Sequence, residues 1–465
     1  MTKKKQITPI FEPIRAVYRR VTVSIIQRLL RNSQKQSAMV PMAYRPIPNR
    51  LLYVAASSLP YHVSGYTTRT HAVQKALRTS GLDVITMTRP GYPRDRSDRL
   101  VADSLHETWV DDIAYQHIQF PSHHRPLALY VWQASRQMMK FAIQHQVGGI
   151  QAASNHVNAL PALIAAKTLA IPFFYEMRGL WELTRASRVS GFGHSQGYRQ
   201  GLELEALVAS YADRVYVISD QLKQFAINQW GIHPQKIALL PNCISPDDFP
   251  ELEEQIKASV GVSKTIGYAG SLMDYEGLDI LLDAIAILHR EGAKVNLRIV
   301  GGGECLESLL NQAKALRIER CVHFYGRVSP EVARELILTS DLVCLPRKPY
   351  AVCEIIPPIK LVEAMAMGKP VIVPNLPVFQ DELNVNTHKD SNASSIQSQE
   401  SHETDAAWFF ESGSAADLAK VISTAFSDEA VLKSKSIRAR RYALENRNWQ
   451  NYVDDVGRTL SMGGK

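Results

Sequence analysis

The chain has 465 residues, of which 45% are hydrophobic and 21% are charged, as is usual for a soluble globular enzyme. This length exceeds what one hydrophobic core normally holds, so we predict two domains. The five cysteines form no C-x-x-C pair, which argues against a zinc site or a disulfide framework and favours a reducing compartment. No run of eighteen apolar residues occurs, so no membrane-spanning segment is predicted.

The net charge of +8 is concentrated at the N-terminus. Residues 1–45 hold ten lysines and arginines against one glutamate, so this arm carries +9 and the rest of the chain sums to −1. A neutral body argues against nucleic-acid binding. Apolar residues recur in the arm at spacings of three or four, which predicts an amphipathic helix within residues 8–31: Ile10, Ile14, Val17, Val21 and Ile25. Such a helix can lie on an anionic membrane surface, whereas a disordered tail or a helix docked on the body is the alternative.

From residue 50, short apolar runs alternate with helical segments. The expected strands are 51–56, 83–88, 148–154, 171–178 and 214–219, with helices near 68–80 and 158–170. This alternation predicts a parallel sheet with right-handed crossovers, in which ligands bind beyond the carboxyl ends of the strands. That rule selects Ser64–Gly65, Asn155–His156 and Glu176–Arg178. Each also has a purely structural explanation, since His156 could cap a helix and Glu176 could simply pair with Arg178.

A second sheet is predicted after a strand and a Pro-Asn turn in residues 236–249 and a polar crossing segment at 251–264. Its expected strands are 265–271, 295–303, 321–326, 341–346 and 369–374, and helices near 414–426 and 429–460 follow. Gly270 and Gly301–Gly303 lie between strand and helix, where glycine lets backbone N–H groups approach a phosphate, although left-handed turns alone would also explain them. Residues 384–405 have almost no apolar side chains and are predicted to be a disordered surface insertion.

The stretch 341–368, DLVCLPRKPYAVCEIIPPIKLVEAMAMG, combines these elements with charge. A short strand leads into a loop with Arg347 and Lys348, and two prolines then suit the start of a helix that stops at Gly368. Glu354 stands before the prolines.

The helix in this stretch carries Lys360 and Glu363 one turn apart. Carboxylates accept hydrogen bonds from sugar hydroxyls and cations hold phosphate, so the pattern indicates a polyhydroxylated anionic ligand. Solvent-exposed ion pairs at helical spacing are the alternative.

This stretch resembles the C-terminal signature of glycosyltransferase family 4, the retaining nucleotide-sugar enzymes of the GT-B fold. It is particularly similar to a subgroup of bacterial surface-polysaccharide enzymes with the pattern PRK…E..xP.K..EAMA.GKPVI. The segments SLPYHVSGYTTRTH, RPGYPRD and YEMRGLWELT resemble the N-terminal half of the same subgroup. The resemblance covers nearly all of residues 50–460.

The resemblance implies an α/β protein with two Rossmann-like, doubly wound parallel-sheet domains that face a cleft. We therefore expect a basic arm at 1–45, an acceptor-side domain at 46–245, a nucleotide-sugar-binding domain at 246–435 and C-terminal helices at 436–465 that cross back to the first domain.

The resemblance also assigns roles to residues. Glu354 is expected to contact the donor sugar and Glu363 the ribose hydroxyls. Many relatives carry His where Arg178 stands, so His156 is our prediction for the first-domain group nearest the reacting carbon. The predicted catalytic residues are His156, Glu176, Arg178 and Glu354. The predicted donor-binding residues are Gly65, Gly270, Ser271, Gly302, Gly303, Arg327, Arg347, Lys348, Lys360 and Glu363.

Two departures from the family pattern bear on the donor site. Eight residues separate Glu354 from Glu363, where the commoner pattern has seven. Relatives commonly place Arg and Lys on the diphosphate at the positions where this chain has Ser271 and Glu276, so both cations are missing. The diphosphate would then depend on three other cations, Arg347, Lys348 and Lys360.

These features together predict a glycosyltransferase that transfers a sugar with retention from a UDP- or GDP-sugar to a saccharide or lipid-linked glycan, in cell-surface polysaccharide synthesis. The nucleotide sugar is a substrate, and no cofactor is expected. Since no Asp-x-Asp occurs, a metal-independent mechanism is predicted. The expected location is the cytoplasm, at the inner face of the membrane through residues 1–45. The alternatives are a nucleotide-sugar epimerase or hydrolase on the same fold, or a non-catalytic, membrane-tethered scaffold subunit.

Overall fold

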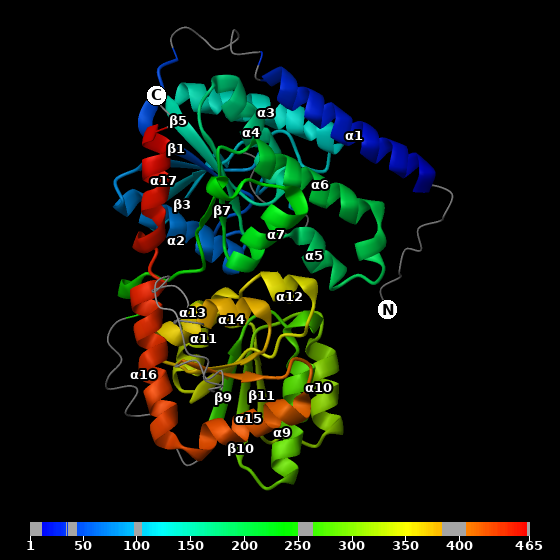
Figure 1. Ribbon diagram of the computed structural model, residues 1–465, viewed down its shortest axis with the longest axis vertical. Coiled ribbons are helices and arrows are strands. Elements are labelled where there is room, and N and C mark those ends of the chain that lie inside the picture. The colour runs from blue at the N-terminus through cyan, green and yellow to red at the C-terminus, as the bar shows by residue number, and fades with distance from the viewer. Residues whose placement is uncertain are drawn as a thin grey trace, which may run out of the picture. The chain divides into compact units, whose positions relative to one another are not determined.

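The computed structural model describes residues 12–33, 35, 44–96, 105–249, 264–383 and 406–462. The chain divides into two compact units (Figure 1). Unit 1 consists of the described parts of 1–218, 223–240 and 452–465, and unit 2 of those of 219–222 and 241–451. The predicted insertion at 384–405 and nearly all of the predicted crossing segment at 251–264 lie outside the described residues.

Unit 1 contains an eight-stranded sheet in the order β3-β4-β2-β1-β5-β6-β7-β8. The strands are β1 (Ile47–Ala55), β2 (Asp83–Thr88), β3 (Glu107–Val110), β4 (Ile113–Gln116), β5 (Val147–Ala153), β6 (Phe173–Met177), β7 (Arg214–Val217) and β8 (Ile237–Leu239). All neighbours are parallel except β3 and β4, which form an antiparallel hairpin at the sheet edge. The chain order reverses between β1 and β5, so the carboxyl ends of these two strands form a topological switch point, where ligands bind in open α/β sheets.

The helices of unit 1 connect these strands. They are α1 (Glu12–Ser33), α2 (Gly65–Thr79), α3 (Leu127–Gln144), α4 (His156–Leu169), α5 (Trp181–Ala186), α6 (Gln196–Tyr211), most of α7 (Asp220–Trp230) and α17 (Gln450–Met462). The C-terminal α17 completes this unit through polar and apolar contacts. Asp455 accepts hydrogen bonds from Arg214 and Tyr216 of β7, each at 3.1 Å, and buried Leu460 packs where Gly149 of β5 leaves room.

Unit 2 contains a six-stranded parallel sheet in the order β11-β10-β9-β12-β13-β14. Its strands are β9 (Lys264–Ala269), β10 (Val295–Val300), β11 (Val322–Gly326), β12 (Leu342–Cys344), β13 (Val371–Pro374) and β14 (Ala407–Phe410). Numbered within the unit, this is the 3-2-1-4-5-6 order of a Rossmann sheet, with the switch point at the carboxyl ends of β9 and β12. The prediction of two parallel-sheet α/β domains is confirmed.

The helices of unit 2 are α9 (Leu278–Arg290), α10 (Leu306–Ala315), α11 (Pro330–Leu338), α12 (Ala351–Ile355), α13 (Ile359–Ala366), α14 (Pro377–Leu383), α15 (Ala415–Ser427) and α16 (Glu429–Asn446). Helix α16 packs on α13 and α15. The segment predicted to cross back, 436–465, is therefore shared between the units, because α16 stays with unit 2 and unit 1 resumes at residue 452.

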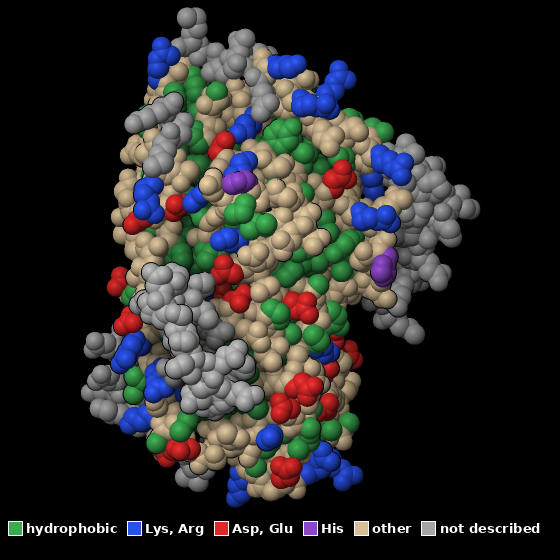
Figure 2. Space-filling view, in the orientation of Figure 1, with side chains coloured by type: hydrophobic (Ala, Val, Ile, Leu, Met, Phe, Trp, Pro, Cys, Tyr) green, Lys and Arg blue, Asp and Glu red, His purple; other side chains and the backbone are tan. Residues whose placement is uncertain are grey.

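Helix α1 is docked on α3, α4 and α6. Its inward face buries Val23, Ile26 and Leu30, which recur every three or four residues. Of the predicted membrane-facing stripe, Val21 and Ile25 are exposed, whereas Ile10 and the side chains of Ile14 and Val17 lie outside the described residues. Lys and Arg side chains are spaced along the surface formed by α1 (Figure 2). No helix in the described ranges is both long enough and apolar enough to cross a bilayer.

Candidate active site

Two glycine-containing loops meet at the carboxyl edge of the unit 2 sheet. The Gly301 backbone lies so close to the Gly270 carbonyl, and the Gly303 backbone so close to Leu272, that a Cβ at Gly301 or at Gly303 would collide with main-chain atoms. A hydrogen bond from the Leu272 N–H to the Gly302 carbonyl, 3.2 Å, joins the loops. Within the described chain, the N–H groups of Ser271, Gly302 and Gly303 have no hydrogen-bond partner. These amides can therefore donate to an anion.

A buried carboxylate, Glu276, lies beside these loops and holds two of the predicted phosphate-binding cations. Arg347 approaches it at 3.1 Å and Lys360 at 2.9 Å, and the Lys360 ammonium also donates to the Tyr268 hydroxyl at 2.8 Å. Burial would raise the pKa of Glu276, but Arg347 and Lys360 outweigh it and hold the pKa at about 2. Gly270 makes room for Lys360, since a Cβ there would come within 2.6 Å of the ammonium nitrogen.

Glu276, which stands where the resemblance led us to expect a lysine, thus forms a cluster with the two cations Arg347 and Lys360. Burial lowers the pKa of Lys360 and the positive charge of Arg347 lowers it further, and the negative charge of Glu276 only partly opposes this. Two positive charges and one negative charge leave a net +1 next to the free loop amides. Sequence reasoning did not identify this arrangement, because Glu276 looked only like the loss of a lysine.

The third predicted cation, Lys348, is engaged elsewhere. Its ammonium lies 2.8 Å from both Asp274 and Asp279. By contrast, Arg327 has an exposed guanidinium with no ion pair or hydrogen bond in the described part of the chain. Arg327 follows β11 directly and its side chain lies against Gly302, where a Cβ would meet its Nε at 3.1 Å. Arg327, one of the predicted donor-binding residues, is therefore an unpartnered cation among the described residues at this edge.

The two glutamates of the 341–368 stretch lie on consecutive short helices, with Glu354 exposed on α12 and Glu363 half-buried on α13. The expected loop before the prolines is thus partly helical, and Pro358 is the N-cap of α13. Burial raises the pKa of Glu363, and Lys360 and Arg334 oppose this effect. Neither carboxylate receives a hydrogen bond from any described residue, so both are free to accept one from a ligand.

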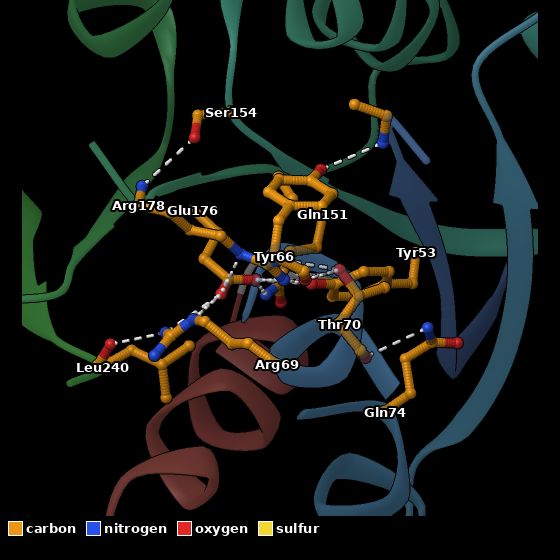
Figure 3. A network of polar contacts seen from close by, with 12 residues as sticks. Tyr53, Tyr66, Arg69, Thr70, Gln74, Gln151, Ser154, Glu176, Arg178 and Leu240 are labelled. Carbon is orange, nitrogen blue, oxygen red and sulfur yellow. Dashed lines mark hydrogen bonds and ion pairs between the residues drawn. The ribbon is translucent and has the colours of Figure 1, made fainter. Parts of the chain in front are cut away.

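In unit 1, Glu176 and Arg178 form the centre of a buried network at the end of β6 (Figure 3). Glu176 receives hydrogen bonds from Arg178 at 2.8 Å and Arg69 at 3.1 Å, and also from Tyr53 and Gln151. Burial would raise the pKa of Glu176, but Arg178 and Arg69 reduce it to about 2. Glu176 and Arg178 pair with each other, as the alternative explanation of these two residues predicted. The hydrogen-bonding groups of both side chains are paired with other groups of the protein. Their main role is therefore to hold the end of β6 in place beside any bound ligand.

His156 begins α4 at the switch point of the unit 1 sheet, and Gly65 begins α2, exposed, at the other side of it. Glu205 of α6 accepts hydrogen bonds from the His156 backbone N–H at 2.7 Å and from its Nδ1 at 3.1 Å. Burial would lower the pKa of His156, but Glu205 and Glu182 outweigh it and raise the pKa. The Nε2 atom has no partner among the described residues. His156 therefore presents Nε2 while Nδ1 is held by the protein.

Glu182 and Glu205, which contact His156, were not selected from the sequence. Glu182 is in the YEMRGLWELT segment that the resemblance quoted, but Glu205 is on α6, 49 residues from His156. The one signal in the sequence is that Glu205 lies on the same helical face as the apolar residues Leu204 and Val208, which are buried in α6.

Comparison with known proteins bears on what this arrangement does. Residues 251–445 match the family profile described as glycosyl transferases group 1, and residues 64–243 match that of the glycosyl transferase 4-like domain. The two matches coincide with most of unit 2 and most of unit 1. Together they cover most of the chain, which is therefore a glycosyltransferase.

The glycosyltransferase resembles other proteins over different shares of its length. It is 37% identical over 113 residues to an uncharacterized glycosyltransferase of Haemophilus influenzae, a match that covers 24% of this chain and 30% of that relative's length. It is 22% identical over 333 residues to a glycogen synthase of Mycobacterium tuberculosis, which covers 70% of this chain and 78% of that protein.

Solved structures share the fold of this glycosyltransferase. Sucrose-phosphate synthase of Thermosynechococcus elongatus superposes with a TM-score of 0.69 at 14% identity, covering 89% of this chain and 98% of that one. HepE of Anabaena superposes with a TM-score of 0.64 at 18% identity, covering 89% and 99%.

Proposed function

We propose that this glycosyltransferase transfers a hexose with retention from a nucleotide sugar, bound by unit 2, to a saccharide or lipid-linked glycan in the synthesis of cell-surface polysaccharide. The observation that carries this proposal is the unpartnered, half-buried carboxylate of Glu363 on α13. A half-buried carboxylate without a hydrogen bond is costly unless a ligand supplies donors. Paired ribose hydroxyls are such donors. The resemblance to family 4 assigns the same role to Glu363.

The other donor groups divide by the chemistry they offer. Glu354 is exposed and unpartnered, and accepts hydroxyls of the donor sugar. Lys360 and Arg347, which share Glu276, supply net positive charge for the diphosphate. Arg327 and the N–H groups of Ser271, Gly302 and Gly303 add donors beside them. Lys348 remains a predicted donor-binding residue, but its two aspartate partners make its contribution the smallest of the four cations.

These groups support catalysis by electrostatic stabilisation. When the bond between the anomeric carbon and the diphosphate breaks, negative charge grows on the leaving diphosphate. Preorganised cations and amides lower the energy of that charge without a metal ion at the donor site. The transfer at this site is therefore proposed to be metal-independent.

In unit 1 we propose that His156 is the group that contacts the acceptor hydroxyl through Nε2. Glu205 fixes its ring by holding Nδ1, as a carboxylate often does for a functional imidazole. Glu176 and Arg178 act as positioning residues that hold the end of β6, and Gly65 keeps the start of α2 open to a phosphate. The epimerase, hydrolase and scaffold alternatives receive no support from the relatives.

The donor is proposed to be a UDP-hexose, since HepE of Anabaena has been crystallised in complex with UDP-glucose and belongs to the same fold. Thermal stabilisation by a panel of UDP-, GDP-, ADP- and dTDP-sugars identifies the nucleotide.

Calorimetry with that nucleotide sugar then tests Glu363. Glu363→Ala should weaken binding by about 2 kcal/mol, roughly 30-fold, because it removes a charged acceptor for two hydroxyls. Glu319→Ala, an exposed glutamate before β11, is the matched control and should bind as the wild type does. Equal affinities for the two variants would overturn the donor assignment. Nucleotide release that needs no acceptor would instead indicate a hydrolase.

We also propose that the enzyme contacts an anionic membrane at the cytoplasmic face through α1. Tyr18, Val21 and Ile25 are exposed on the side of α1 that does not face the body, alongside Arg20 and Arg28. Neighbouring α3 adds exposed Leu129 and Trp132 with Arg136. Apolar and aromatic side chains mixed with arginine suit the boundary between headgroups and acyl chains. A lipid-linked acceptor would lie at the same surface.

A further inference from the structure

A second polar cluster, buried in unit 1, is only partly explained by the proposed transfer. His156 of α4, Glu182 of α5 and Glu205 of α6 place one ligand atom each within 4.8 Å of one another, and all three side chains are buried. His156 Nδ1 lies 3.1 Å from Glu205 and 3.7 Å from Glu182. Ligands that share a metal ion at roughly 2.1 Å in tetrahedral geometry are separated by comparable distances.

The decisive side chain is Glu182. It is 1% exposed, and neither of its carboxylate oxygens has a hydrogen-bond partner. A buried carboxylate without donors is strongly unfavourable in its charged form, so a cation beside it would stabilise that form.

The cluster has been given room by the fold. Gly201 of α6 faces the Glu182 carboxylate so closely that a Cβ at this position would collide with it. A glycine in the middle of a helix costs roughly 0.5–1 kcal/mol relative to alanine. The helix therefore accepts a less favourable residue where the carboxylate needs space.

Glu205 is anchored, whereas Glu182 is not. Glu205 accepts the His156 backbone N–H at 2.7 Å and also the Tyr175 hydroxyl, so its orientation is fixed. A metal binds the imidazole only at a nitrogen without a proton, so it would displace the proton that the two carboxylates favour on His156. The imidazole is then neutral, and the two carboxylates give the cluster a charge of −2. A divalent cation has the charge that balances it.

We propose that His156 Nδ1, Glu182 and Glu205 bind one first-row divalent cation, of which Zn²⁺ is the type. Imidazole nitrogen with two carboxylate oxygens is a donor set that suits Zn²⁺, and three protein ligands leave a fourth position for water. The three ligands belong to unit 1, whereas the proposed donor-binding groups belong to unit 2. The cation ties α4, α5 and α6 together and takes the place of the hydrogen bond between His156 Nδ1 and Glu205. It leaves Nε2 on the opposite side of the imidazole ring.

The test uses the full chain after chelation with EDTA and removal of the chelator. Co²⁺ is added as a spectroscopic substitute for Zn²⁺, and Zn²⁺ binding is measured by equilibrium dialysis with metal analysis. The wild type should bind one ion that gives visible Co²⁺ absorption bands and raises the melting temperature. Glu182→Gln, which keeps the shape of the side chain, should lose the bands and weaken binding at least about 100-fold, beyond the loss typical of outer partners.

Two further variants make the result decisive. Glu203→Gln removes an exposed glutamate from α6, the helix that carries Glu205, and should bind the metal as the wild type does. This variant controls for adventitious binding by surface groups. His156→Gln should lose the Co²⁺ bands as Glu182→Gln does. Wild-type spectra and stoichiometry in both ligand variants, or no Zn²⁺-dependent stabilisation of the wild type, would overturn the proposal. Because the readouts are metal content and spectra, they are independent of whether the proposed transfer is correct.

Discussion

Arg327 offers the sharpest test of how the diphosphate is held. It follows β11 at the carboxyl edge of the unit 2 sheet, its guanidinium has no partner among the described residues, and its side chain lies against Gly302. Arginine and phosphate form charge-assisted hydrogen bonds, each contributing roughly 1.5–3 kcal/mol. Arg327 is exposed, so solvent screening favours the lower figure. Arg327→Met should therefore weaken UDP binding by about 1.5 kcal/mol, roughly tenfold.

Arg320 provides a matched control for this substitution. It is also exposed and without a partner in the described chain, but it precedes β11 and so lies at the opposite edge of the same sheet. Isothermal titration calorimetry with UDP should give an unchanged Kd for Arg320→Met. Added NaCl should weaken UDP binding more in the wild type than in Arg327→Met, because salt screens the charge that the variant lacks. Equal Kd values for the two variants would refute the assignment of Arg327 to the diphosphate.

Three other variants test separate parts of the structure. Glu276→Gln removes the anion between two buried cations and should lower the free energy of unfolding, measured by urea denaturation, by about 3 kcal/mol. UDP should restore more stability to this variant than to the wild type. An unchanged urea midpoint would contradict the charge cluster. Burial lowers the pKa of His117 from 6.5 to about 4 in the folded protein. Between these pH values the unfolded chain binds a proton at His117 and the folded protein does not, so the stability present above pH 6.5 is lost as the pH falls towards 4. Wild type should accordingly lose about 2 kcal/mol more than His117→Gln between pH 7 and 4.5, and parallel pH profiles would exclude this. Val21→Ser combined with Ile25→Ser should reduce sedimentation with anionic vesicles several-fold at unchanged melting temperature, and full binding by the double variant would rule out α1 as the contact.

Most of the fold could be predicted from the sequence because its strands are buried on both faces. The run 171–178 is largely apolar and contains β6, all five residues of which are buried. The hairpin of β3 and β4 was missed, since Glu107–Val110 is only four residues long and half-exposed at the sheet edge. Short edge strands carry too little apolar pattern to stand out.

The candidate site was only partly predictable. Glu363 and Gly270 stand in a recognisable local pattern, and the structure leaves the first unpartnered and sets the second beside Lys360. The pairing of Glu276 with Arg347 and Lys360 joins residues that are 71 and 84 positions apart. Such long-range pairing depends on sheet order, which charge spacing does not encode. Docking of α1 on the body was the alternative prediction, but its buried face of Val23, Ile26 and Leu30 was not selected, because two apolar stripes compete on one helix.

The return of α17 to unit 1 affects how the chain folds during synthesis. Helix α17 supplies Asp455 to β7 and Leu460 to the surface of β5, so the first sheet keeps an uncovered patch until residue 460 has left the ribosome. All of unit 2 is translated in the interval. Nascent chains halted before residue 450 should therefore expose apolar surface on an otherwise formed first unit, and this patch is where a chaperone would bind.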